Sequence, residues 1–121
     1  MATPHAAPLD IVSVGPLGEA LRSVPSTSLV KTDRLQLLHH VLVAHQDVAE
    51  HHVDDECVLH CLEGSVEVVM PGGTRRLDAG DLVLLPAGQR YALSAREDSA
   101  LLQTLLLAGG DAGDGPQRVR P

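Results

Sequence analysis

The sequence predicts an all-β domain, a barrel or sandwich of short antiparallel strands. Segments of roughly four to eight residues rich in Val and Leu recur along the chain, and clusters of Gly, Pro, Asp and Ser separate them. One stretch near the N-terminus, residues 16–24, has apolar residues at helical spacing, with Pro25 after it. We therefore expect packed sheets with at most one short N-terminal helix.

The N-terminal part is expected to contain a tail, an edge strand and one irregular element. Residues 1–8 lack periodicity and carry two prolines, which predicts a disordered tail. Residues 9–14 (LDIVSV) are β-branched enough for an edge strand. Pro16 suits the first turn of a short helix, and a non-helical excursion is the alternative.

The remaining chain predicts a regular succession of strands in one domain spanning residues 9–108. We expect these strands at residues 26–31, 34–45, 57–62, 65–70, 74–77, 82–85, 91–95 and 100–107, with residues 46–50 as a connection. The C-terminal residues 109–121 (GGDAGDGPQRVRP) offer almost nothing to bury and are expected to be disordered.

Alternation along a strand assigns several side chains to faces. In the strand at 57–62, Cys57, Leu59 and Cys61 share one face, and the intervening residues share the other. His39 and His40 are adjacent and must point to opposite sides, so one of them is a candidate to line the interior.

Composition and charge exclude several classes of protein. The net charge of −7 argues against nucleic-acid binding, which depends on Lys and Arg neutralising phosphates. The apolar runs are too short to span a bilayer. Cys57 and Cys61 on one strand lie about 13 Å apart at ~3.3 Å per residue, too far for a disulfide. Without a recognisable signal peptide, we expect a reduced, cytoplasmic protein.

Two stretches hold the residues that suggest a function. The first is His45 to Gly64 (HQDVAEHHVDDECVLHCLEG), and the second is Gly80 to Tyr91 (GDLVLLPAGQRY). Their spacings resemble the two motifs of the cupin superfamily, G-x5-H-x-H-x3-E-x6-G and G-x5-P-x-G-x2-H. The positions that match are His51 and Gly64 in the first motif, and Gly80, Pro86 and Gly88 in the second.

The resemblance covers roughly residues 30–107 and implies a small single-domain cupin, a double-sheet jelly-roll barrel with a ligand or metal inside. The cupin set of three imidazoles and a carboxylate suits Fe, Mn, Ni or Zn. Here Val53 and Cys57 stand at the second histidine and the glutamate, and Tyr91 stands at the histidine of the second motif. Valine has no donor atom, and tyrosine holds its proton with a pKa near ~10. Cysteine can ligate as thiolate, and the resemblance includes thiol dioxygenases with cysteine at this position, but those keep their histidines. We therefore expect a degenerate metal site and favour no cofactor.

A shifted register would restore some ligands. Glu50, His52 and Glu56 reproduce the missing pattern if the strand contains a one-residue bulge. The shift would exchange inward and outward residues, expelling Cys57 and Leu59 from the core. A metal, if bound, would then draw on a non-standard set, which comprises His51, His52, Glu56, Cys57 and Tyr91.

The leading functional hypothesis is a barrel that binds a small molecule in its interior without strong catalytic activity. The predicted pocket is lined by His51, Val53, Cys57 and Tyr91, with Gln89 at the rim. Tyr91 is the only aromatic residue, as expected of a pocket wall with a polar tip. A dioxygenase-like or isomerase-like metalloenzyme is the alternative. A third reading is a cofactor-free acid or base site on His51 and Tyr91, or a sensor subunit. Apolar residues on both faces of several strands predict a homodimer.

Overall fold

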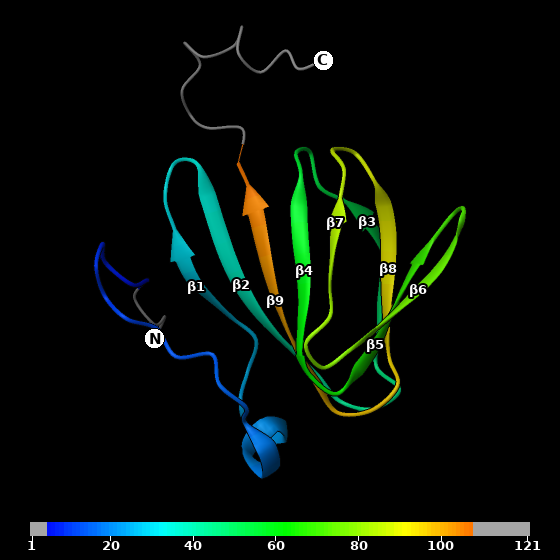
Figure 1. Cartoon of the computed structure of the whole chain (residues 1–121), viewed down its shortest axis with the longest axis horizontal. Coiled ribbons are helices and arrows are strands. Elements are labelled where there is room, and N and C mark those ends of the chain that lie inside the picture. The colour runs from blue at the N-terminus through cyan, green and yellow to red at the C-terminus, as the bar shows by residue number, and fades with distance from the viewer. Residues whose placement is uncertain (1–4, 108–121) are drawn as a thin grey trace, which may run out of the picture.

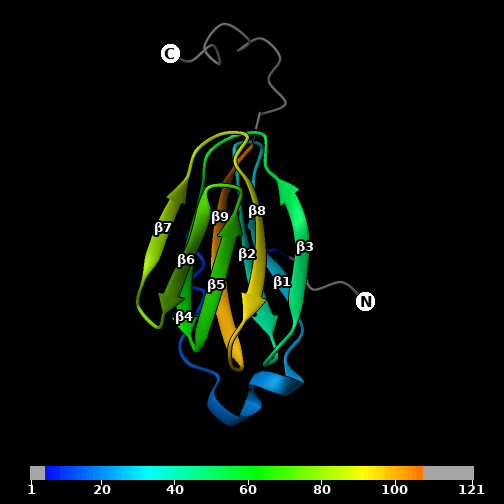
Figure 2. The same cartoon turned by 90° about the vertical axis from the view of Figure 1, so that its right-hand side faces the viewer.

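The computed structural model describes residues 5–107, which form two facing antiparallel sheets and one short 3-10 helix (Figure 1). The elements are η1 (Gly18–Ser23), β1 (Thr27–Lys31), β2 (Leu35–Leu42), β3 (Asp47–His52), β4 (Cys57–Glu63), β5 (Ser65–Met70), β6 (Gly73–Asp78), β7 (Leu82–Leu85), β8 (Arg90–Ala95) and β9 (Ser99–Leu106). One sheet has the order β1-β2-β9-β4-β7 and the other β3-β8-β5-β6. Figure 2 shows the two sheets face to face, which confirms the predicted all-β jelly-roll class.

The core lies between the sheets and follows the predicted alternation. In β4, Cys57, Leu59 and Cys61 are buried and the residues between them are partly exposed, so the predicted faces are confirmed. Strand β8 alternates in the same way and buries Tyr91 and Leu93 against them. Burying these side chains between two sheets is the main stabilising term in such a fold.

The strand predicted at residues 9–14 is absent. These residues pair with no strand, and Leu9 and Ile11 are almost fully exposed. β-branched composition favours a strand only where a neighbouring strand and a buried face are available, and this segment has neither. Residues 46–50 were predicted as a connection, but most of them belong to β3, which pairs with β8. Because most of the side chains of β3 face solvent, its sequence carries little apolar signal.

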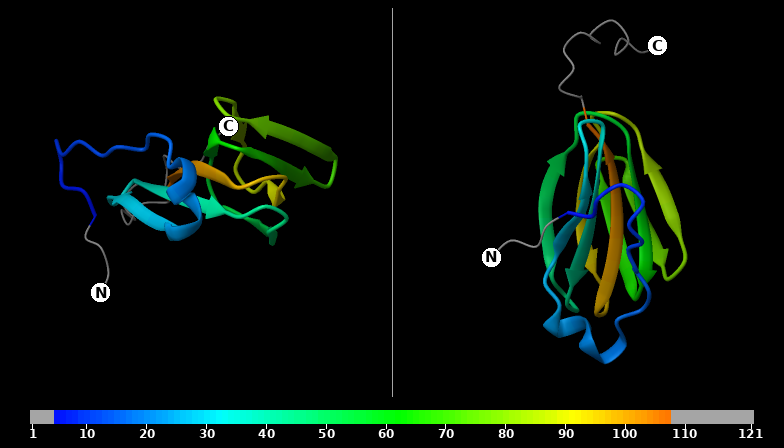
Figure 3. Two further views of the ribbon diagram at one scale, coloured as in Figure 1. Left: turned by 90° about the horizontal axis from the view of Figure 1, so that it is seen from below. Right: turned by 90° about the vertical axis from the view of Figure 1, so that its left-hand side faces the viewer.

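The N-terminal segment closes one end of the sandwich and runs across the outer face of the five-stranded sheet (Figure 3). The Glu63 carboxylate accepts hydrogen bonds from the backbone N–H groups of Leu17 and Gly18 at 2.6 and 3.1 Å. Arg22 donates to Asp98 at 2.8 Å, and Leu21 is buried. These contacts hold η1 beneath the sheets, where a short helix was one of the two expectations.

The two predicted tails lie mostly outside the described residues. Residues 1–4 of the first tail and residues 109–121 of the second are not described. Residues 5–8 lie against the edge strand β1, where the N–H of Ala6 donates to the carbonyl of Leu29 at 3.0 Å. In the described part of the chain, no helix is long and apolar enough to cross a membrane.

Candidate functional site

A group of polar side chains meets inside the otherwise apolar barrel. Gln103 Nε2 donates to the hydroxyl of Tyr91 at 2.7 Å and to Cys57 Sγ at 3.6 Å. The Oε1 atom of Gln103 accepts a hydrogen bond from His40 Nε2 at 2.8 Å. Tyr91, Cys57 and Gln103 are all buried. We call these four residues, His40, Cys57, Tyr91 and Gln103, the Gln103 network.

Strand register explains why these four side chains meet. In the five-stranded sheet, Gln103 of β9 lies opposite Leu59 of β4 and His40 of β2 lies opposite Leu101 of β9. Leu59 and Leu101 point into the core, so their partners do as well. Tyr91 comes from β8 in the opposite sheet. The Gln103 network therefore links the two sheets through a hydrogen bond.

Burial keeps the thiols and the phenol of this interior uncharged. It raises the pKa values of the Cys57 thiol and the Tyr91 phenol, and the hydrogen bond from Gln103 opposes each rise only in part. Both groups therefore stay protonated near neutral pH. Burial and the nearby carboxylates of Asp78 and Asp81 raise the pKa of Cys61 to about 11. None of the three side chains offers an anion to a metal under these conditions.

His51 covers Tyr91 from the rim. The two residues are register partners in β3 and β8, and their ring centroids lie 4.5 Å apart at an interplanar angle of 50°. His51 Nδ1 hydrogen-bonds the carbonyl of Ala49 at 3.0 Å, and the side chain remains exposed. His51 and Tyr91, which were both predicted to line the pocket, are thus in ring contact.

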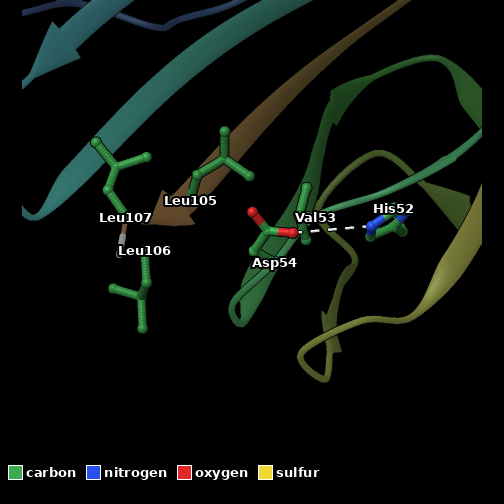
Figure 4. Close-up of a pocket in the computed structure, with 6 residues that line it drawn as sticks. All are labelled: His52, Val53, Asp54, Leu105, Leu106 and Leu107. Atoms are coloured by element: carbon green, nitrogen blue, oxygen red, sulfur yellow. Dashed lines mark ion pairs between the residues drawn. The ribbon is translucent and has the colours of Figure 1, made fainter. Parts of the chain in front are cut away.

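A small cleft opens at the end of the barrel opposite η1 (Figure 4). Its volume is about 210 Å³, and it is lined by His52, Val53, Asp54, Leu105, Leu106 and Leu107. His52 Nε2 lies 3.7 Å from Asp54 Oδ1 at its polar side. Val53 and Leu105 also pack against the buried core. We call this cleft the mouth cleft.

The structure does not bring all of the predicted pocket residues together. Cys57 and Tyr91 join the interior network, Val53 lines the mouth cleft, and His51 lies on the rim. Gln89 is partly buried, and its Nε2 atom donates to the neighbouring carbonyl of Arg90 at 3.0 Å.

The shifted register is not adopted at the first motif. Glu56 is exposed while Cys57 and Leu59 are buried, which is the reverse of what that register requires. An irregularity does exist in β3, but it falls earlier, between Val48 and His51. His52 stays exposed and pairs with Asp54.

Gln103 is the interior residue that sequence reasoning missed. It is the central polar side chain on the inward face of β9, where Leu101 and Leu105 flank it at two-residue spacing. The sequence could have indicated this residue, because an amide at two-residue spacing from inward leucines is expected to be buried and to need hydrogen-bond partners. His40 was one of two adjacent candidates, and its bond to Gln103 identifies it as the inward one.

The interior residues do not fit a metal ion. Among residues 5–107, no three side chains of His, Cys, Asp or Glu come together as a possible metal site. Val53 has no donor atom, and the Tyr91 hydroxyl already accepts a hydrogen bond from Gln103. A divalent ion here would have to displace Gln103 and remove protons that burial retains.

The two motifs both lie on strands and turns around this interior. A family model described as the EutQ-like cupin domain matches residues 47–100, from β3 to the start of β9. These residues match a cupin domain, and the fold of the chain is the cupin fold. Cupins often bind transition metals, whereas the interior residues of this chain do not suit a metal ion. No curated protein matches the chain in sequence.

Solved structures support the same fold. A cupin superfamily protein from Desulfitobacterium hafniense is 21% identical, with a TM-score of 0.65 over 68% of this chain and 75% of that chain. A protein of unknown function from Streptococcus pyogenes is also 21% identical, with a TM-score of 0.71 over 91% of this chain and all of that chain. A salicylate 1,2-dioxygenase from Pseudaminobacter salicylatoxidans is 25% identical, with a TM-score of 0.59 over 65% of this chain and 25% of that chain.

Proposed function

We propose that this cupin-fold protein binds a small, uncharged molecule through the mouth of its barrel, without a bound metal and without strong catalytic activity. The observation that carries the proposal is the neutral Gln103 network at the motif positions of Cys57 and Tyr91. A charged ligand entering this interior would lose its hydration and find no opposite charge in the network. An uncharged ligand avoids that cost.

The mouth cleft supports this proposal by its lining and its size. Val53 and the leucines 105–107 form an apolar wall, and the pair of His52 and Asp54 supplies polar groups at one side. Because Val53 and Leu105 also contact the core, the floor of the cleft adjoins the buried interior. A volume of about 210 Å³ is below the roughly 300 Å³ at which drug-sized pockets begin, so the ligand is expected to be small.

Filling the mouth cleft should abolish ligand binding. We expect a screen of small uncharged compounds by ligand-observed NMR to yield binders to the wild type, and Val53→Phe to lose them because the added ring occupies the cleft. The matched control is Val69→Phe, since Val69 is exposed on β5 away from the cleft. Binding that survives in Val53→Phe would contradict the proposed location. A stoichiometric transition metal in protein purified without chelators would contradict metal-free binding.

A metal-dependent enzyme is the second candidate, favoured by the similarity to the salicylate 1,2-dioxygenase. Such a site would draw on His51, His52, Glu56, Cys57 and Tyr91, of which the first three are exposed and the last two are buried. This candidate requires His51→Ala to lose a metal that the wild type retains. Metal content unchanged by that substitution would exclude His51 as a ligand.

We also propose that the protein forms a homodimer through the part of the outer face of its five-stranded sheet that the N-terminal segment leaves exposed. Leu82, Leu84 and Leu106 are 60%, 57% and 44% exposed there, and β7 is an edge strand of that sheet. Exposed apolar side chains on one face are typical of an interface. We expect Leu84→Lys to sediment as a monomer, and Val69→Lys on the other sheet to sediment as the wild type does. A monomeric wild type would contradict the proposal.

A further inference from the structure

We propose that the side-chain amide of Gln103 takes the structural place of the metal ion in this barrel. It joins the side chains at two positions where the cupin motifs have metal ligands, Cys57 and Tyr91. This inference rests on the proposal that the barrel holds no metal. It adds that the hydrogen bonds of Gln103 connect the interior side chains in place of metal coordination.

The hydrogen-bonding capacity of a glutamine matches the contacts of Gln103. An amide has two N–H donors and one carbonyl acceptor. Its nitrogen donates to Tyr91 Oη and Cys57 Sγ, and its oxygen accepts from His40 Nε2. Each donor therefore has a partner and the acceptor has one as well, so the buried amide is not left unsatisfied.

The strands that Gln103 joins give the network its structural role. His40 lies on β2, Cys57 on β4 and Gln103 on β9 of one sheet, whereas Tyr91 lies on β8 of the other. A metal ion in such a barrel would connect side chains from several strands by coordination. Here three hydrogen bonds make a similar connection, and they do so without placing any charge in the interior.

The network also disfavours a divalent ion. An ion at its centre would break the three hydrogen bonds of Gln103 and would need the Tyr91 and Cys57 groups as anions. Burial already raises the pKa values of both groups, so their deprotonation is costly. The amide thus lies between these groups, and burial keeps them in protonated forms that bind metals poorly.

Tyr91 gives a clean reporter, because it is the only aromatic residue in the chain. We expect Gln103→Met, which conserves volume, to shift the phenolate absorbance titration of Tyr91 to higher pH, since the donor that stabilises the phenolate is lost. The unfolding equilibrium constant should rise by roughly tenfold or more.

The matched control for this substitution is Gln36→Met. Gln36 is a partly buried glutamine on β2 that donates to Ser28 Oγ at 2.8 Å, outside the network. The Gln36→Met variant should leave the Tyr91 titration unchanged and should reduce the free energy of unfolding less than Gln103→Met does. Equal effects of the two substitutions on stability, with no change in the Tyr91 titration, would overturn the proposal.

A measurement on the wild type keeps the proposal testable if Gln103→Met does not fold. The side-chain NH₂ protons of Gln103 should exchange with solvent much more slowly than those of Gln89, which is partly exposed. Tyr91→Phe, which removes only the hydroxyl, should accelerate the exchange at Gln103. Exchange at Gln103 as fast as at Gln89 would overturn this inference whatever the metal content. A stoichiometric metal bound away from Tyr91 would overturn only the metal-free proposal.

Discussion

The Gly64→Ala variant is expected to lose about 4 kcal/mol or more of unfolding free energy, among the largest effects of adding a single methyl group. Gly64 joins β4 to β5 at a φ of +85°, a left-handed conformation that is unfavourable for alanine. An added Cβ would also meet Ser99 Oγ and the carbonyl oxygen of Asp98, and would lie 2.7 Å from Ser99 Cα. Ser99 cannot yield readily, because its hydroxyl bonds the backbone N–H and carbonyl of Ser65.

Gly80→Ala separates the two causes of this loss. Gly80 has a similar φ of +94°, but an added Cβ would meet nothing within 4 Å. Only the backbone strain applies there, and we expect a loss of about 1 to 2 kcal/mol. Urea unfolding followed by far-ultraviolet circular dichroism would measure both variants. Equal losses of unfolding free energy in the two variants would contradict this prediction, because they would mean that the contact of the added Cβ with Ser99 costs nothing.

Both cysteines are expected to resist alkylation in the folded protein and to react once it is unfolded. Cys57 and Cys61 are buried, and the thiolate is the reactive form. The pKa of Cys61 is raised from 9.0 to about 11, which leaves about a hundredfold less thiolate at neutral pH. Mass spectrometry of iodoacetamide labelling, with and without urea, would measure both rates.

Val69→Cys provides the control for this labelling, because position 69 is exposed on β5 of the other sheet, outside the proposed dimer interface. Its introduced thiol should react in the folded state while the two native thiols do not. Rapid native labelling of Cys61 would contradict its burial.

The raised pKa of Cys61 also predicts how stability changes in alkali. Between pH 9.0 and about pH 11, the thiol of Cys61 holds its proton in the folded protein more often than in the unfolded chain. The contribution of Cys61 to the free energy of unfolding is therefore fully present below pH 9.0 and is lost as the pH rises through about 11. Burial raises the pKa of Tyr91 as well, so its contribution has the same sign.

Local sequence predicted the faces of β4 correctly, because alternation depends only on neighbouring residues. Cys57 and Leu59 point inward whichever strands lie beside them. The same rule failed for β3, whose polar residues gave no sign that they would pair with β8. It also failed at residues 9–14, where strand-like composition found no partner.

The sequence by itself determined the all-β class, the motif spacing and the loss of donors at Val53. Those features lie within short stretches, so they can be read without knowing which strands meet. Only the tertiary structure decided that Gln103 bonds Tyr91, twelve residues earlier, and Cys57, forty-six residues earlier. Alternation states which way a side chain points, but which distant strands face each other is set by the pairing and packing of the whole sandwich.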